Sequence, residues 1–149
     1  METEVKVLRI LLVEDDKADR EKTLEALRRF KLGYEVRFVS GCHEALDYLL
    51  GRGRFHERRR HPLPDLVLLD FSLAPIDGMR VLERIRAVDW LKATPVVILC
   101  STPEERERAV AGAAQAQACA MKPVSPDDMR SLLRMTYPTM FDYAAMRLE

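Results

Sequence analysis

Short hydrophobic runs alternate along the chain with segments that carry apolar residues at helical spacing. The runs are four to six residues long, and the Gly, Pro or charged residues around them are typical of the ends of buried strands. The predicted strands are Leu8–Val13, 36–39, 66–69, Val96–Cys100 and the alanine-rich segment Ala118–Met121.

The segments between these runs are predicted to form helices. Thr102 and Ser125 each precede a proline and acidic residues, which is the usual order of an N-cap, a first-turn proline and first-turn acids. Glu105 stands where a capping box places its glutamate, and Asp16 is a further expected cap. The predicted helices are 16–29, a helix capped by Ser40 that ends at 50, 78–88, 103–113 and one that begins at 126.

Strands that alternate with helices form parallel sheets with helices on both faces. We therefore predict an α/β fold in which a doubly wound, five-stranded parallel sheet is covered by five helices. The expected domain is 1–135. Residues 136–149 form a C-terminal extension with several aromatic residues, which we expect to pack on this domain or on a dimer partner.

Composition and charge exclude several functions. The 149 residues hold 24 basic and 24 acidic side chains, and this zero balance is unlike a nucleic-acid-binding protein. Segment 52–60 holds five arginines and one acid, and we interpret it as a solvated loop. No apolar run approaches the ~18 residues of a membrane span, and the N-terminus lacks a secretory pattern, so a cytoplasmic protein is expected. Three irregularly spaced cysteines predict reduced thiols.

Polar side chains follow four of the predicted strands. Glu14 and Asp15 come after the first, Asp70 after the third, Ser101 after the fourth and Lys122 after the fifth. In doubly wound sheets the functional crevice lies at these carboxyl ends. Clustered carboxylates favour Mg²⁺, and a carboxylate beside the metal can attack phosphorus. A lysine and a hydroxyl would then stabilise the phosphoryl oxygens.

With these residues in this order, the chain resembles the response regulator receiver domains of two-component signalling. The matching segments are 10–15, 65–70 with Gly78 eight residues later, 95–99 and the pair Lys122-Pro123. The resemblance implies a flavodoxin-like sheet with strand order 2-1-3-4-5. A long loop at 51–64 and the C-terminal extension are similar in layout to single-domain regulators associated with bacterial phytochromes.

The resemblance implies a role for each site residue. Asp70 would accept the phosphoryl group, Asp15 would bind Mg²⁺ directly, Glu14 would hold it through water, and Ser72 would offer its backbone carbonyl to it. Lys122 would contact the phosphoryl group. The chain would then be a phosphoacceptor with at most slow autodephosphorylation and not an enzyme.

The same resemblance implies partners. The phosphoryl donor would be a histidine kinase, for which the phytochrome type is the candidate. A homodimer would form through the fourth helix, the fifth strand, the fifth helix and the C-terminal extension. No nucleic acid or membrane is expected as a partner.

Two cysteines depart from the family pattern. Cys100 occupies the switch position, where receiver domains have Thr or Ser, and a thiol is a weaker hydrogen-bond donor than a hydroxyl. Ser101 is the neighbouring hydroxyl, and Cys119 replaces the switch aromatic. The alternative function is therefore a phosphorylation-independent interaction module on the same fold. A redox pair of Cys100 and Cys119 is a further hypothesis. A dehalogenase-type phosphatase is disfavoured because Ser72 stands where its second aspartate belongs.

Overall fold

Five parallel strands form one sheet in the computed structural model, in the order β2-β1-β3-β4-β5. The structure describes residues 7–29, 34–73, 76–112, 116 and 118–136. The strands are β1 (Leu8–Val13), β2 (Tyr34–Val39), β3 (Leu66–Asp70), β4 (Val96–Cys100) and β5 (Ala118–Met121). The predicted doubly wound sheet and its strand order are confirmed.

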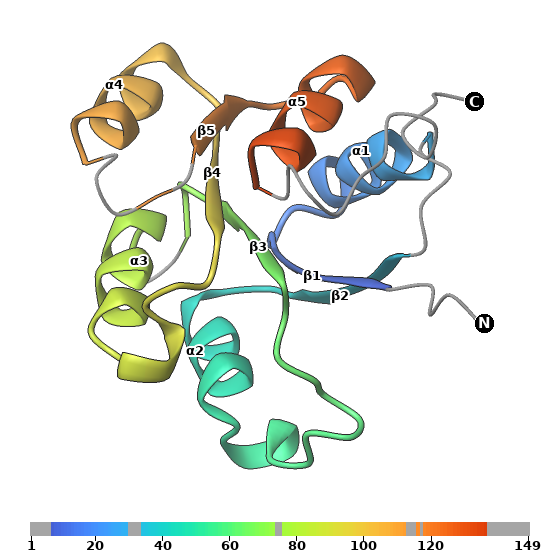
Figure 1. Ribbon diagram of the computed structural model, residues 1–149. Helices are drawn as coiled ribbons and strands as arrows, with labels where there is room; N and C mark the ends of the chain where they lie inside the picture. The colour runs from blue at the N-terminus through green and yellow to red at the C-terminus, as the bar shows by residue number, and fades with distance from the viewer. Residues whose placement is uncertain (1–6, 30–33, 74–75, 113–115, 117, 137–149) are drawn as a thin grey trace.

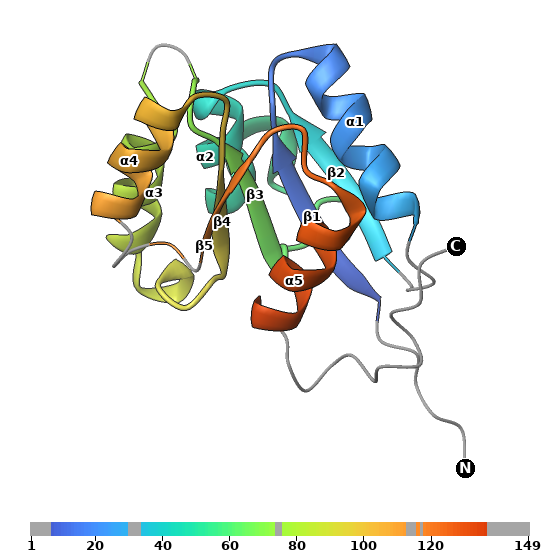
Figure 2. The same ribbon diagram turned by 90° about the horizontal axis from the view of Figure 1, so that it is seen from above.

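Helices cover both faces of this sheet (Figures 1 and 2). Buried Leu27 and Met129 place α1 and α5 on one face, while Leu49 and Leu82 place α2 and α3 on the other. Helix α4 lies on the second face through Ala109. The helices are α1 (Lys17–Arg28), α2 (Cys42–Leu50), α3 (Gly78–Arg86), α4 (Pro103–Ala111) and α5 (Pro126–Thr136), with short 3-10 helices η1 (Gly53–Phe55) and η2 (Asp89–Leu91).

Most of the predicted helix starts are confirmed. The side chains of Asp16, Thr102 and Ser125 each accept a hydrogen bond from a backbone amide three residues later. The prediction for Ser40 is wrong. Gly41 is the N-cap of α2, without a side-chain cap, so Ser40 lies one residue too early to bond the first turn.

The strands bury side chains on both faces of the sheet, and their pairing register shows that four of them end together. Leu11 faces α2 and α3, whereas Ile10 and Leu12 face α1 and α5. Val13 of β1 pairs with Leu69 of β3, and Asp70 of β3 pairs with Leu99 of β4. Cys100 and Met121, the last residues of β4 and β5, also pair with each other. The carboxyl ends of β1, β3, β4 and β5 therefore meet at one edge of the sheet.

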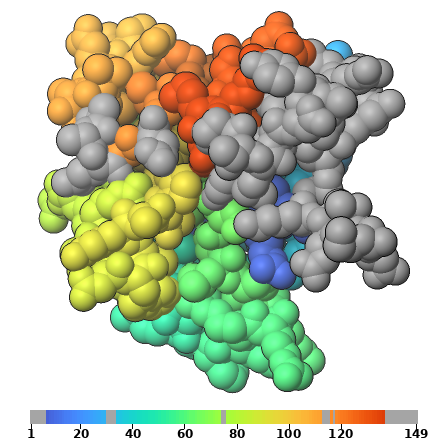
Figure 3. Space-filling model, viewed as in Figure 1, coloured from blue at the N-terminus to red at the C-terminus, as the bar shows by residue number. Residues whose placement is uncertain are grey.

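The arginine-rich loop between α2 and β3 is only partly the solvated loop that we predicted. Arg52 and Arg54 are exposed, but Arg58 donates hydrogen bonds to the carbonyl oxygens of Tyr48 and Leu49 at 2.7 Å each. Arg58 thereby adds side-chain donors at the C-terminal end of α2, where the carbonyl oxygen of Tyr48 also accepts from the amide of Gly51. The loop forms the lower end of the view in Figure 3 and leads into the first residue of β3, at the opposite edge from Asp70.

None of the helices in the described ranges is long and apolar enough to cross a membrane. The predicted extension lies almost wholly outside the described residues, since only Thr136 of it belongs to α5.

Candidate functional site

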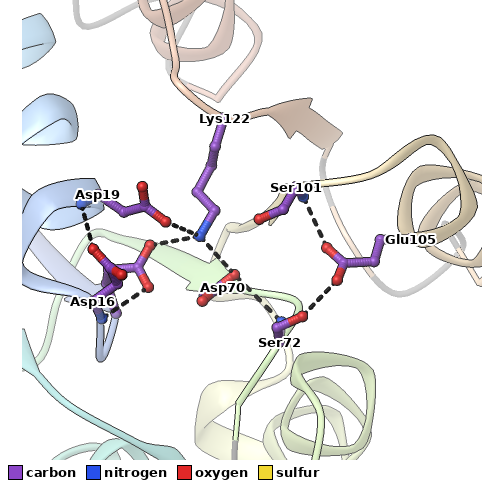
Figure 4. Close-up of polar contacts among 8 residues, drawn as sticks. Asp16, Asp19, Asp70, Ser72, Ser101, Glu105 and Lys122 are labelled. Atoms are coloured by element: carbon purple, nitrogen blue, oxygen red, sulfur yellow. Dashed lines mark hydrogen bonds and ion pairs between the residues drawn. The ribbon is translucent and has the colours of Figure 1, made fainter.

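A buried lysine lies at the edge of the sheet where the strands end (Figure 4). Nζ of Lys122 lies 2.8 Å from Oε1 of Glu14, 2.9 Å from Oδ2 of Asp19 and 3.2 Å from Oδ1 of Asp70. The side chains of Glu14, Asp70 and Lys122 are 0%, 2% and 7% exposed. One ammonium group therefore offsets part of the negative charge of the carboxylates of Glu14 and Asp70, which are buried side by side.

The backbone holds these residues in place. The amide of Glu14 donates to the carbonyl oxygen of Val39, which continues the pairing of β1 with β2. Asp70 is the last residue of β3 and lies between β1 and β4. The amide of Lys122 donates to the carbonyl oxygen of Cys100 at 2.7 Å. The functional side chains are thus attached to the rigid sheet rather than to free loops.

Carboxylate oxygens of Glu14, Asp15 and Asp70 lie within 4.8 Å of one another. Asp15 is exposed, and it lines an open hollow of about 420 Å³ together with Ser72 and Glu105. Mg²⁺ prefers oxygen ligands and keeps several waters, so it needs a cluster that is open on one side. The donor set and the open side of this cluster fit Mg²⁺.

The electrostatics of the site also favour a cation. Burial, together with the neighbouring Asp70, raises the pKa of Glu14 to about 7, although Lys122 acts in the opposite direction. Burial alone would lower the pKa of Lys122, but its hydrogen bonds to Glu14 and Asp19 outweigh burial and raise it above its ordinary value. Lys122 is therefore charged, while the carboxylates around it remain in excess.

Asp19 is a site residue that the sequence analysis missed. It lies in the first turn of α1, where its amide donates to Oδ1 of Asp16 at 2.9 Å. Its carboxylate points to Lys122 (Figure 4). The sequence carried no specific signal for it, because acids are common in the first turn of a helix, where they interact favourably with the helix N-terminus.

Cys100 is the last residue of β4, and Ser101 follows it. Cys100 is fully buried, and burial, with a further contribution from Cys119, raises the pKa of its thiol to about 11. Cys119 pairs in register with Ile98 rather than with Cys100, and both cysteines are free thiols. The exposed Ser101 donates its amide to Oε1 of Glu105 at 2.8 Å.

Ser72 lies at the border of the site. Its amide donates to Oδ1 of Asp70 at 3.3 Å, and its hydroxyl donates to Oε2 of Glu105. Among the predicted site residues, Glu14, Asp15, Asp70, Ser72 and Lys122 are thus brought together. Ser101 and Cys100 are linked to the site through Glu105 and through the Lys122 amide.

A sequence profile of the response regulator receiver domain matches residues 10–134. The chain belongs to this family. The recognition made from the acidic residues and the lysine is therefore confirmed, and the chain contains a receiver domain of two-component signalling.

Two curated relatives of this receiver domain are response regulators. The probable methanogenesis regulatory protein FilR2 of Methanothrix harundinacea (strain 6Ac) is 33% identical over 121 residues, which cover 81% of this chain and 76% of FilR2. Response regulator Rcp1 of Synechocystis sp. (strain ATCC 27184 / PCC 6803 / Kazusa) is 35% identical over 96 residues, 64% of this chain and 63% of Rcp1.

Solved structures similar to this receiver domain include regulators associated with phytochromes. The bacteriophytochrome response regulator RtBRR has a TM-score of 0.79 at 37% identity and covers 88% of this chain and 78% of its own. AtBRR, also a bacteriophytochrome response regulator, has a TM-score of 0.79 at 36% identity, with 88% and 93% covered. The predicted similarity to phytochrome-associated regulators is confirmed.

Two further similar structures are of response regulators in defined chemical states. The phosphorylated cyanobacterial phytochrome response regulator RcpA has a TM-score of 0.75 at 27% identity and covers 92% of this chain and 98% of its own. The Mn²⁺-bound form of Rcp1 has a TM-score of 0.71 at 26% identity, with 93% and 98% covered.

Proposed function

We propose that this receiver domain accepts a phosphoryl group from a histidine kinase on the carboxylate of Asp70, in the cytoplasm and with Mg²⁺. The observation that carries this proposal is the position of Asp70. Its carboxylate is 2% exposed, lies 3.2 Å from the ammonium group of Lys122 and belongs to an acidic cluster that fits a divalent cation.

The transfer is a displacement at phosphorus. A carboxylate oxygen of Asp70 attacks the phosphorus of a phosphohistidine, a P–O bond forms, and the P–N bond breaks with its electron pair on the imidazole. Lys122 already lies beside Oδ1 of Asp70, so its charge offsets the negative charge of the incoming oxygens. Attack by water on the phosphorus would break the bond to the Asp70 oxygen, release inorganic phosphate and return the carboxylate. The chain would then be a phosphoacceptor with at most slow autodephosphorylation and not an enzyme.

Mg²⁺, when bound, would neutralise charge on the phosphoryl oxygens and hold them in line for transfer. Asp15 and Asp70 would bind it directly, Glu14 would hold it through water, and the backbone carbonyl of Ser72 would complete the protein ligands. The excess of carboxylates over Lys122 supports this assignment, as does the Mn²⁺-bound form of the relative Rcp1.

The relatives also support a class of partner. The similarity to RtBRR and AtBRR makes a phytochrome-type histidine kinase the first donor to test. A homodimer through α4, β5, α5 and the C-terminal extension is a further part of the proposal. Val110 of α4 and Met135 of α5 are 54% and 60% exposed, and a second copy would cover them. Light scattering that gives the monomer mass at working concentration would contradict this dimer.

The experiment is phosphorylation of the purified chain by acetyl phosphate with Mg²⁺, read by intact mass. We expect the gain of one phosphoryl group in the wild type and none in Asp70→Asn or in the presence of a chelator. A kinase panel read in the same way then identifies the donor. A wild-type protein that gains no phosphoryl group from acetyl phosphate or from any kinase would overturn the proposal.

Two cysteines favour the alternative, a phosphorylation-independent interaction module. Cys100 offers a buried thiol with a raised pKa where a hydroxyl donor is expected, and Cys119 replaces the aromatic residue of the usual switch. If the chain is an interaction module, the wild type and Asp70→Asn should bind the partner with equal affinity. If it is a phosphorylated receiver domain, phosphorylation of Asp70 should change the affinity for the partner.

A further inference from the structure

Glu105 joins two loops that border the site (Figure 4). It lies in the first turn of α4, and its Oε1 accepts a hydrogen bond of 2.8 Å from the amide of Ser101. Its Oε2 accepts from the hydroxyl of Ser72, whose own amide donates to Oδ1 of Asp70. Hydrogen-bonded groups therefore run from the carboxylate of Asp70 through Ser72 and Glu105 to the start of α4.

A second contact holds α4 against the same loop. Nη2 of Arg108, one turn after Glu105, lies 3.4 Å from Oδ2 of Asp77, and its guanidinium carbon lies 5.1 Å from the centroid of the Phe71 ring. Glu105, Arg108 and Asp77 all line the open hollow beside Asp15. Asp15 and Ser72, which also line the hollow, adjoin the carboxylate of Asp70, so we expect a phosphoryl group on Asp70 to extend toward the hollow and Glu105.

Neither Cys100 nor Thr102, on either side of Ser101, offers a free hydroxyl donor. Cys100 carries a thiol, which donates weakly. The hydroxyl oxygen of Thr102 accepts the amide of Glu105 as the cap of α4. In the described part of the chain, the Glu105 carboxylate is thus the side-chain group that hydrogen-bonds both the Asp70 loop and the loop before α4.

We propose that the contacts of Glu105 with Ser72 and Ser101, here called the Glu105 bridge, transmit phosphorylation of Asp70 to α4. This inference rests on the proposed function. Phosphorylation replaces the single charge of Asp70 with a group that carries about −1.5 to −2 on three acceptor oxygens. These oxygens compete for the Ser72 hydroxyl and the Ser101 amide and repel the Glu105 carboxylate. The bridge then opens, and the first turn of α4 is released.

Glu105 is accordingly a positioning residue that acts on α4 and not on the transfer itself. Its effect depends on charge as well as on hydrogen bonding, and this separates it from a purely structural cap. Glu105→Gln keeps an oxygen for the Ser101 amide and an amide group for the Ser72 hydroxyl but removes the repulsion. Glu105→Ala removes both contacts, and Ser72→Ala removes one of them.

The experiment combines intact mass with hydrogen exchange of the segment 101–109, before and after treatment with acetyl phosphate and Mg²⁺. In the wild type we expect phosphorylation to speed hydrogen exchange in this segment roughly tenfold. This is about the factor by which the opening equilibrium changes when one hydrogen bond to a charged group is lost. Glu105→Ala should exchange at the faster rate without phosphorylation, and phosphorylation should change it less than twofold. Glu105→Gln should start like the wild type and respond less, and Ser72→Ala should lie between the wild type and Glu105→Ala.

Glu104→Ala is the matched control, because Glu104 is an exposed acid in the same turn and should behave as the wild type. Circular dichroism verifies that each variant is folded. A mass gain without faster exchange in the wild type would overturn the Glu105 bridge alone. So would a full response in Glu105→Ala. Absence of the mass gain would overturn the proposed function and this inference with it.

Discussion

Oδ1 of Asp70 lies 3.2 Å from Nζ of Lys122, and both side chains are almost completely buried. Two carboxylates, from Asp70 and Glu14, share this one ammonium group inside the protein. A buried charge without a partner costs several kcal/mol, so each of the three groups depends on the others. The site is thus a charged unit in the core and not a set of independent surface residues.

Replacement of Lys122 by Met should destabilise the protein strongly. Met fills a similar volume but leaves Glu14 and Asp70 without their cation, and breaking a buried pair in this way costs about 3–5 kcal/mol. We expect a loss of this size in the free energy of unfolding, measured by urea denaturation at pH 8 with a chelator. The loss should shrink at pH 5.5, where Glu14 takes up a proton.

Lys92→Met is the control for this substitution. Lys92 forms an ion pair of 2.8 Å with Asp89, but both side chains are exposed, so its removal should change the free energy of unfolding by less than about 1 kcal/mol. Equal effects of the two substitutions would show that Lys122 does not neutralise the buried carboxylates.

Gly78→Ala should displace the phosphoacceptor loop. A Cβ atom at this position would lie 2.3 Å from the carbonyl oxygen of Asp70 and 3.1 Å from Cα of Phe71. Both contacts are with backbone, which cannot move aside without shifting Asp70. We expect a loss of about 1–3 kcal/mol in the free energy of unfolding, and slower phosphorylation by acetyl phosphate.

Gly112→Ala separates this effect from a general loss of glycine. Its Cβ would lie 2.6 Å from Cε of Met79, the end of a flexible side chain that can rotate away. Phosphorylation of Gly112→Ala should proceed at the wild-type rate. A Gly78→Ala protein that is as stable and as reactive as Gly112→Ala would contradict the close approach at Asp70.

The sequence was sufficient for the sheet and for most of the site. A hydrophobic run that ends in an acid, as at 66–69 before Asp70, places that acid at the carboxyl edge because parallel strands end together. The same reasoning placed Glu14 and Lys122. These predictions needed only the strand pattern and the order of the strands.

The contacts made by long polar side chains were not predictable in this way. Five arginines occur in segment 52–60, and only the fold distinguishes Arg58, which bonds the end of α2, from its solvated neighbours. Asp19 reads as an ordinary first-turn acid until Lys122 is placed opposite it. Glu105 has the position of a capping-box glutamate, yet its carboxylate reaches Ser72 and Ser101 instead. Each contact depends on tertiary distances that local pattern does not encode.

Binding of Mg²⁺ should stabilise the folded protein through the acidic cluster. At a free concentration ten times the dissociation constant, one bound ion adds about 1.4 kcal/mol to the free energy of unfolding. We expect this increment in urea denaturation with Mg²⁺ against a chelator, and its loss in Asp15→Asn. Asp16→Asn should keep it, because Asp16 caps α1 and Asn is also a good cap. An undiminished increment in Asp15→Asn would exclude Asp15 as a ligand.

The metal-free protein should become less stable as the pH rises from about 5 to 7. Burial raises the pKa of Glu14 to about 7 from the 4.5 of an ordinary glutamate, so the folded state holds a proton that the unfolded chain has already released. This proton favours folding below pH 4.5, and its contribution is lost as the pH passes 7. The loss should amount to roughly 2–3 kcal/mol at about 1.4 kcal/mol per unit.

Glu14→Gln isolates this contribution from those of all other ionisable groups, which both proteins share. The difference in free energy of unfolding between wild type and Glu14→Gln should vary between pH 5 and about pH 8 and be constant at higher pH. Urea denaturation of both proteins with a chelator measures it. A difference that does not vary with pH would contradict the raised pKa of Glu14.

The three cysteines should differ sharply in reactivity. Cys42 and Cys100 are buried, whereas Cys119 is partly exposed. Since burial raises the pKa of Cys100 to about 11, only about 0.1% of it is thiolate at pH 8, and the thiolate is the reactive form. Iodoacetamide at pH 8 should therefore modify Cys119 first in the native protein, as mass spectrometry of peptides would show, and Cys119→Ser should remove this fast reaction. Fast labelling of Cys100 would contradict its burial. An oxidant that removes two hydrogen atoms and links Cys100 to Cys119 would instead favour the redox pair over two independent thiols.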